Sequence, residues 1–300
     1  MPASRPNCSR NRTLSTRAIA GASSKVNFAA LAALVLFAIS AFAQTDRGGD
    51  PLGGQISFGL DGQNYSSGRM SNIGSIDATL RLSPRLALEA LTNGGSYFGE
   101  GFGGGGGFIT VKPLGKTYLT VGGTKNTNTA TTFTWSTSLE AGTVVYRCRT
   151  GTPVHRCRTA VGGLEADFNA TLREYHLTSS AGVLGLTPRI VIYFPRDWTL
   201  TLRGGALRAT IGGLSDWTPS GGVSVNVPVT RRLILSPGVN LDSEPADILQ
   251  IKNISSRQFG SGVRFWLTER TSLGGYYFRV LYGANRLTAD SYGASYTLRF

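Results

Sequence analysis

The sequence has few charged residues, histidines and cysteines for its length. Charged residues are 16% of 300 positions, against about 25% in ordinary soluble domains, so a disordered polyelectrolyte is excluded. Two histidines and three cysteines provide no zinc-finger spacing and no metal constellation. No nucleotide-binding loop occurs, and no apolar run of about 20 residues follows residue 43, as a helical membrane protein would need. We therefore expect no cofactor, no metal site and no spanning helix.

Residues 1–43 have the three parts of a cleaved signal peptide. Five basic residues and no acidic ones precede an apolar core at 28–39, which is followed by the small-x-small site Ala41–Phe42–Ala43. The apolar stretch is about 16 residues, short of the roughly 20 that a membrane anchor needs. We predict cleavage after Ala43, a short linker over 44–54, and no lipoprotein, because no cysteine stands directly after the site.

The exported chain stays basic, with 25 Lys and Arg against 17 Asp and Glu after the five basic residues of 1–43 are removed from the totals. A basic soluble protein would suggest nucleic acid. Export disfavours that partner, and no recognition-helix or aromatic-basic pattern supports it. We predict no nucleic-acid partner.

From Gln55 onward, apolar and polar residues alternate over stretches of about ten residues, the length of a tilted membrane strand. The clearest stretches are 76–82, 198–203, 221–227 and 292–300. Alternation gives each strand one apolar face. Strands in lipid must pair every backbone group, so the sheet has to close. The prediction is an all-β, closed antiparallel transmembrane β-barrel over residues 55–300.

The connections fall into two classes, as in transmembrane barrels. The short ones are 82–86, 112–116, 194–198, 227–231 and 267–271, and the longer Gly/Ser/Asn-rich ones are 61–72, 93–106, 210–219, 242–256 and 283–288. This pattern predicts about 12 strands. Residues 125–184 form either one large external loop or two further strands, near 133–139 and 164–172, giving 14. We favour 12, because 14 would require one long periplasmic turn.

Cys148 and Cys157 lie in matching Arg-Cys-Arg-Thr segments on either side of a Thr-Gly-Thr-Pro turn. In an oxidising compartment this pattern predicts a disulfide that closes a small hairpin. A metal site with His155 would lack a fourth ligand. With 12 strands the hairpin is external, and with 14 it is periplasmic.

The last strand has apolar residues at alternate positions and ends on an aromatic residue. Here the sequence resembles bacterial outer-membrane β-barrel proteins, whose insertion signal is matched by Gly293, Tyr296, Leu298 and Phe300. The resemblance implies the cell outer membrane as location, outer-membrane lipid as surroundings, and the barrel-assembly machinery and periplasmic chaperones as partners in biogenesis. Residues 186–300 are similar to YaiO-type barrels through the segment 194–198 and the closing Tyr-Thr-Leu-Arg-Phe.

Alternation also predicts which charges face inward. The even residues from Tyr276 to Tyr282 are assigned to lipid, as are those from Tyr292 to Phe300. Charged residues of the opposite parity are predicted to line the lumen: Asp77, Arg81, Glu89, Arg203, Arg264, Arg279 and Arg299. With five arginines, this set predicts either a narrow porin-like channel with a basic, anion-favouring lumen or a structural barrel plugged by ion pairs.

Two alternatives remain at this point. A surface binding, adhesion or envelope-scaffold barrel would use loops 93–106, 125–184 and 242–256, with the run Gly103–Gly107 flexible. A lipid-modifying enzyme would need a site such as the line Glu174, His176 and Thr178, which loosely resembles an acid-base-nucleophile arrangement but lacks an oxyanion partner. We predict that the protein is not an enzyme. The oligomeric state stays open.

Overall fold

The structure is a computed structural model that describes residues 53–97, 99–113, 116–127, 133–147, 161–176, 180–211, 214–242, 256–282 and 288–300, all within the unit Asp46–Phe300. The signal peptide, residues 44–52 of the linker, Cys148, Cys157 and His155 lie outside the described residues, so those assignments stay predictions. Among the described residues, no helix is long and apolar enough to cross a membrane.

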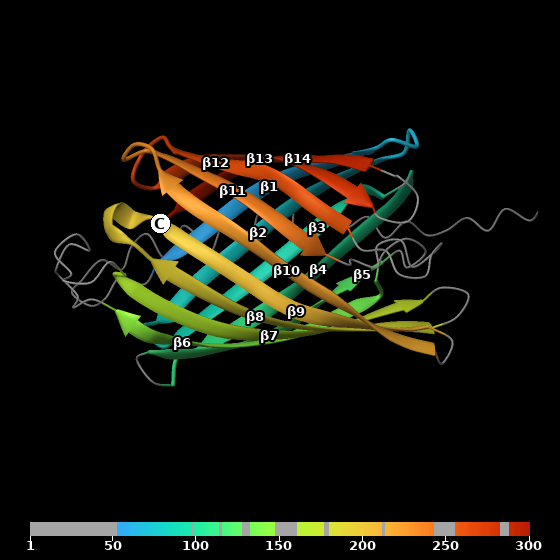
Figure 1. The fold of residues 1–300 in the computed structure, drawn as a ribbon, viewed down its shortest axis with the longest axis horizontal. Coiled ribbons are helices and arrows are strands. Elements are labelled where there is room, and N and C mark those ends of the chain that lie inside the picture. Colours follow the sequence, from blue (N-terminus) through green and yellow to red (C-terminus); the bar gives the residue numbers. More distant parts are fainter. Residues whose placement is uncertain are drawn as a thin grey trace, which may run out of the picture. The chain divides into compact units, whose positions relative to one another are not determined.

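The described strands form one closed antiparallel barrel, as predicted from the alternation. Each strand pairs with its neighbours in sequence, β1 pairs with β14, and the strands run obliquely around the wall (Figure 1). The strands are β1 (Gly54–Tyr65), β2 (Met70–Ser83), β3 (Leu86–Tyr97), β4 (Glu100–Val111), β5 (Thr117–Asn126), β6 (Trp135–Arg147), β7 (Gly163–His176), β8 (Ser180–Tyr193), β9 (Thr199–Ile211), β10 (Leu214–Pro228), β11 (Leu233–Asp242), β12 (Ser256–Trp266), β13 (Thr271–Tyr282) and β14 (Thr288–Arg299).

The described residues contain 14 strands, the alternative that the sequence left open, and the favoured count of 12 is wrong. Residues 125–184 are not one large loop, because β6 and β7 pair with each other and with β5 and β8. The connection from Arg147 to Gly163 joins these strands at the barrel end that carries the short turns. The rule of short turns at that end, which favoured 12, fails at this one connection.

The five predicted short connections all lie at one end of the barrel, between β2 and β3, β4 and β5, β8 and β9, β10 and β11, and β12 and β13. A 3₁₀ turn, Pro195–Asp197, forms part of the third. Several predicted long loops are wrong, because the strands extend into them. Segment 61–72 contains the ends of β1 and β2, and the hairpin between β3 and β4 turns at Gly99, whose φ of 86° suits glycine.

The run Gly103–Gly107, predicted to be a flexible loop, lies inside β4. The neighbouring strands approach it closely. A side chain at Gly104 would collide with the amide of Asn126, and one at Gly106 would collide with the backbone of β5. Glycine therefore permits close packing in this part of the wall, and the segment is not available as a binding loop.

The register assigns each side chain to the outer or inner face, because directly paired residues point to the same side. Phe58 pairs with Tyr296 and Ile76, and Val121 pairs with Ile109 and Leu139. Large apolar side chains on this face are exposed, up to 71% for Leu60. The outer face is thus an apolar belt, as the alternation predicted.

On β13 the predicted facing is wrong. Leu273 and Tyr277 pair with Tyr296 and Tyr292, so the odd residues of this strand face outward. Arg279 shares that face and donates two hydrogen bonds of 2.7 Å to the carboxylate of its cross-strand partner Asp290. The pair lies close to the long-loop ends of both strands, where a charge on the outer face costs far less than at the membrane centre. Arg279 is therefore not a lumen-lining residue.

Candidate functional site: the polar barrel interior

The barrel interior carries charges of both signs. The register places Asp77, Arg81, Glu89, Arg203, Arg264 and Arg299 on the inner face, as the sequence indicated. It also places four acids there that the sequence analysis did not single out: Asp61, Glu140, Glu165 and Asp167. Their parity within each strand was a signal that could have found them. The interior of the described strands is therefore not a basic lining.

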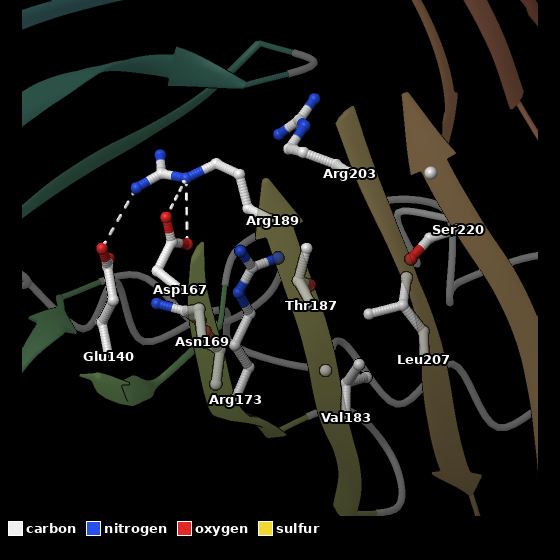
Figure 2. Close-up of a pocket in the computed structure, with 13 residues that line it drawn as sticks. Glu140, Asp167, Asn169, Arg173, Val183, Thr187, Arg189, Arg203, Leu207 and Ser220 are labelled. Carbon is white, nitrogen blue, oxygen red and sulfur yellow. Dashed lines mark hydrogen bonds and ion pairs between the residues drawn. The ribbon is translucent and has the colours of Figure 1, made fainter. Parts of the chain in front are cut away.

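A network of charged side chains is centred on Arg189 of β8 (Figure 2). Its Nε donates hydrogen bonds to both carboxylate oxygens of Asp167, at 2.9 and 2.8 Å, and its Nη2 donates to Oε1 of Glu140 at 3.2 Å. The Asp167 side chain is 3% exposed, whereas that of Arg189 is 39% exposed. Tyr118 donates to the same Glu140 oxygen at 2.7 Å. The two carboxylates outweigh the single Arg189 charge by one negative charge, and the contacts join β5, β6, β7 and β8.

Arg203 of β9 is held differently. It lies directly opposite Arg189 across the strand pair, so the two guanidinium groups belong to one row of inward side chains. Its Nη2 donates to the amide oxygen of Asn240, two strands away on β11, at 2.7 Å. Gly222 of β10 lies between them, and a side chain there would collide with that oxygen. The Arg203 charge thus has a neutral partner and faces the lumen.

A small pocket of about 300 Å³ lies along this wall. Its polar lining includes Glu140, Asp167, Arg173, Arg189 and Arg203. Figure 2 shows Arg173 and Arg203 outside the dashed contacts that join Arg189 to Asp167 and Glu140. With two acids and three arginines in its lining, the pocket is a charged, polar recess in the wall.

A larger cavity of about 840 Å³ opens at the short-turn end. Asp61 of β1 and Asp77 of β2 contribute acids, while Arg264 of β12 and Arg231 of the β10–β11 turn contribute bases. The same cavity is lined by the hydroxyl and amide side chains Ser57, Ser75, Thr199, Asn226, Ser236 and Ser295. These groups suit a solvated polar solute, because hydroxyls and amides can replace the hydrogen bonds that water made.

A tyrosine bridge closes the seam between the first and last strands. The hydroxyl of Tyr276 on β13 donates to the Asp61 carboxylate on β1 at 2.6 Å, passing over Gly293 of β14. A side chain at Gly293 would collide with the Tyr276 ring and with Asp61. At the end of the seam, the amides of Gly54 and Phe300 each donate to the carbonyl of the other, at 2.8 and 3.0 Å. Gly293 and Phe300 therefore have structural roles besides the insertion signal that the resemblance implied.

The other predicted residues have distinct surroundings. Arg299 lies over the ring of Trp266, 4.3 Å from its centroid, near the short-turn end. Asp77 and Glu89, on neighbouring strands, lie within hydrogen-bonding reach of each other rather than of an arginine. Tyr296 and Leu298 face outward beside Phe58 and Ile56. The predicted ion-paired plug of Asp77, Arg81 and Glu89 has no ion pair among the described contacts.

Toward the long-loop end, the interior holds apolar clusters. Tyr65, Val280 and Ala289 are buried, and the partly buried Tyr282 packs against them with its ring stacked 6.3 Å from that of Tyr65. A second cluster contains Tyr175, Ala181 and Val183.

In the described chain no group of histidine, cysteine and acidic side chains could hold a metal ion. Thr178 and the His176 side chain lie outside the described part, and Glu174 pairs with outward-facing Trp135.

No family model matches the chain, and no curated protein matches it, so the YaiO-type resemblance gains no support. Among solved structures, the fold is similar to a bacterial polysaccharide outer membrane secretin (9% identity, 82% of this chain and 98% of that chain, TM-score 0.49). It is also similar to Omp33 of Acinetobacter baumannii (10% identity, 84% of this chain and 100% of that chain, TM-score 0.47). A third similar structure is an anion-selective porin from Comamonas acidovorans (10% identity, 83% of this chain and 98% of that chain, TM-score 0.46). At these values the likeness supports no statement about activity, and the function proposed below is based on the chain's own residues.

Proposed function

We propose that the chain is an integral outer-membrane β-barrel that conducts small polar solutes through its interior. The observation that carries this proposal is the contrast between the two faces of the wall. The outer face bears exposed apolar side chains such as Leu60 and Phe259, and the inner face encloses a cavity of about 840 Å³ to which acids, arginines and hydroxyl groups contribute. A protein in water gains nothing from an apolar exterior around a hydrophilic interior, whereas a barrel in lipid requires both.

The size of the barrel favours a channel over a filled structure. With 14 strands spaced about 4.8 Å apart and tilted about 40°, a circular wall has a backbone diameter of about 28 Å. Two sheets whose side chains interdigitate lie only about 10 Å apart. Side chains from opposite walls therefore leave space between them, and that space is where a solute would pass.

The charges argue for weak ion selectivity. Arg203 and Arg264 favour anions, and Asp61, Asp77 and Glu89 oppose that preference from the other wall. The sequence analysis expected a channel that favours anions. We propose instead a channel that conducts small polar solutes of either charge.

Planar-bilayer recording of the purified, refolded chain tests the channel. We expect stepwise conductance in KCl and a reversal potential near zero across a salt gradient. Heat-modifiable migration on a gel verifies that the same sample is folded. Folded protein that gives no channel events would overturn the proposal, and a strong preference for either ion would overturn the weak selectivity.

Insertion by the barrel-assembly machinery is a second part of the proposal. Gly293, Tyr296, Leu298 and Phe300 lie on the closing strand β14 or at its end, where recognition of an unfolded chain would precede pairing with β1. Removal of Phe300 should lower the yield of assembled barrel in cells more than it lowers refolding into pure lipid. Equal losses in both assays would contradict recognition of Phe300 by the machinery.

A further inference from the structure

We propose that the 840 Å³ cavity is a binding site for small zwitterions, molecules that carry one ammonium and one carboxylate group. This deepens the channel proposal, on which it rests, by naming the solute class. Acidic and basic side chains line different parts of the same cavity, and the space between them is open to a solute.

The acidic part is formed by the first two strands. Asp61 is fixed by the hydrogen bond from Tyr276, so that one of its oxygens is engaged and the other stays available. Asp77 on β2 lines the same cavity. Asp61 forms no ion pair with an arginine among the described contacts, so an ammonium group entering here meets a negative charge that the wall leaves uncompensated.

The basic part is formed by Arg264 on β12 and Arg231 in the turn before β11. Both side chains are exposed to the cavity, and neither forms an ion pair among the described contacts. Guanidinium groups bind carboxylates through paired hydrogen bonds. Asp197, in the turn before β9, is the one acid that lines the cavity outside β1 and β2, and the two arginines outnumber it.

The strand order separates the two parts. Arg264 on β12 is separated from Asp61 on β1 by β13 and β14. No direct ion pair spans this separation, and a molecule with charges at both ends can contact both groups at once. An anion meets the carboxylates and a cation meets the arginines, so each of these encounters one repulsive wall. A zwitterion encounters none if it orients with its ammonium toward β1.

The test uses four peptides of one length that differ only in their end groups: triglycine, its N-acetylated anion, its amidated cation, and the neutral peptide with both modifications. Binding to the folded barrel in detergent is measured by calorimetry, and entry into proteoliposomes by swelling rates. Each solvated charge contact contributes up to about fivefold. We expect triglycine to bind more tightly than the neutral peptide and to permeate faster than either singly charged peptide.

Two variants locate the preference. Asp61→Asn keeps an oxygen that accepts from Tyr276 but removes the charge, and Arg264→Gln removes the charge at the other end. Each should reduce the triglycine preference about fivefold. Arg203→Gln is the matched control, because Arg203 faces the interior without lining this cavity, and it should leave the preference unchanged.

The outcomes separate this inference from the channel proposal. Conductance with equal binding of all four peptides overturns the zwitterion site and leaves the channel standing. Triglycine binding in detergent without conductance supports the site and overturns the channel. If Arg203→Gln abolishes the preference as strongly as Arg264→Gln, the assignment to this cavity is wrong.

Discussion

Replacing Arg189 with glutamine should destabilise the barrel more than any other single loss of an inward arginine. The change leaves Asp167, 3% exposed, without its charged partner and removes the contact with Glu140. Breaking a buried ion pair costs about 3–5 kcal/mol, because the remaining charge is unpaired. Arg189 itself is 39% exposed, so water offsets part of this loss, and we expect a cost of about 2–3 kcal/mol.

Urea titrations of folding into lipid vesicles, followed by tryptophan fluorescence, measure this cost. The double variant Arg189→Gln/Asp167→Asn removes both charges and should recover about 1–2 kcal/mol relative to Arg189→Gln alone. Arg203→Gln is the control, since it loses one hydrogen bond to a neutral amide and should cost about 1 kcal/mol or less. Equal destabilisation by Arg189→Gln and Arg203→Gln, or further destabilisation by Asp167→Asn, would refute the reasoning.

Three further predictions concern the two faces of the wall, and each is checked by the same urea titration. Gly293→Ala should lower the free energy of unfolding by about 1–3 kcal/mol, because the added carbon crowds the Tyr276 bridge. Gly204→Ala is the control and should be near neutral, because its added carbon meets nothing within 4 Å. Equal losses in the two variants would contradict the bridge. Leu60→Arg should lower the free energy of unfolding by about 2–4 kcal/mol, because it places a charge on the lipid face. Ser75→Arg should not, because Ser75 faces the cavity. A comparable loss for Ser75→Arg would reverse the assigned facing of its strand. Arg279→Gln should leave the urea midpoint close to that of the parent protein, because the exposed pair with Asp290 lies near the rim. A clear loss of stability would place this residue deeper in the membrane.

The fold was predictable from the sequence because alternation acts on every strand separately. Apolar residues such as Val121 and Leu139 must face lipid wherever their strand crosses, so the antiparallel barrel follows from the pattern alone. The number of strands depended on one connection. Nothing in the residues between Arg147 and Gly163 distinguishes a long periplasmic turn from an external loop, and only the pairing of β6 with β5 and β7 decides it.

The facing of β13 could not be read from its sequence because both parities are apolar. Leu273, Tyr277 and Leu281 alternate with Tyr276, Phe278 and Val280, and Arg279 decided the assignment on the assumption that charges avoid lipid. That assumption holds at the membrane centre and weakens toward the rim, where Arg279 pairs with Asp290. Contacts such as Arg189 with Asp167 join residues of adjacent strands, and the alternation alone does not specify which residues pair.

Gly293 has a consequence for how the barrel can close. A one-residue slip of β14 would turn glycine to the outer face and bring a side chain beneath the Tyr276 ring, as would a slip in the other direction. Tyr276 could then no longer reach Asp61 across the seam. Because only glycine leaves room for the Tyr276 ring at this position, the hydrogen bond between Tyr276 and Asp61 can form in only one register of β14. The glycine therefore restricts how the last strand can pair with the first when the barrel closes.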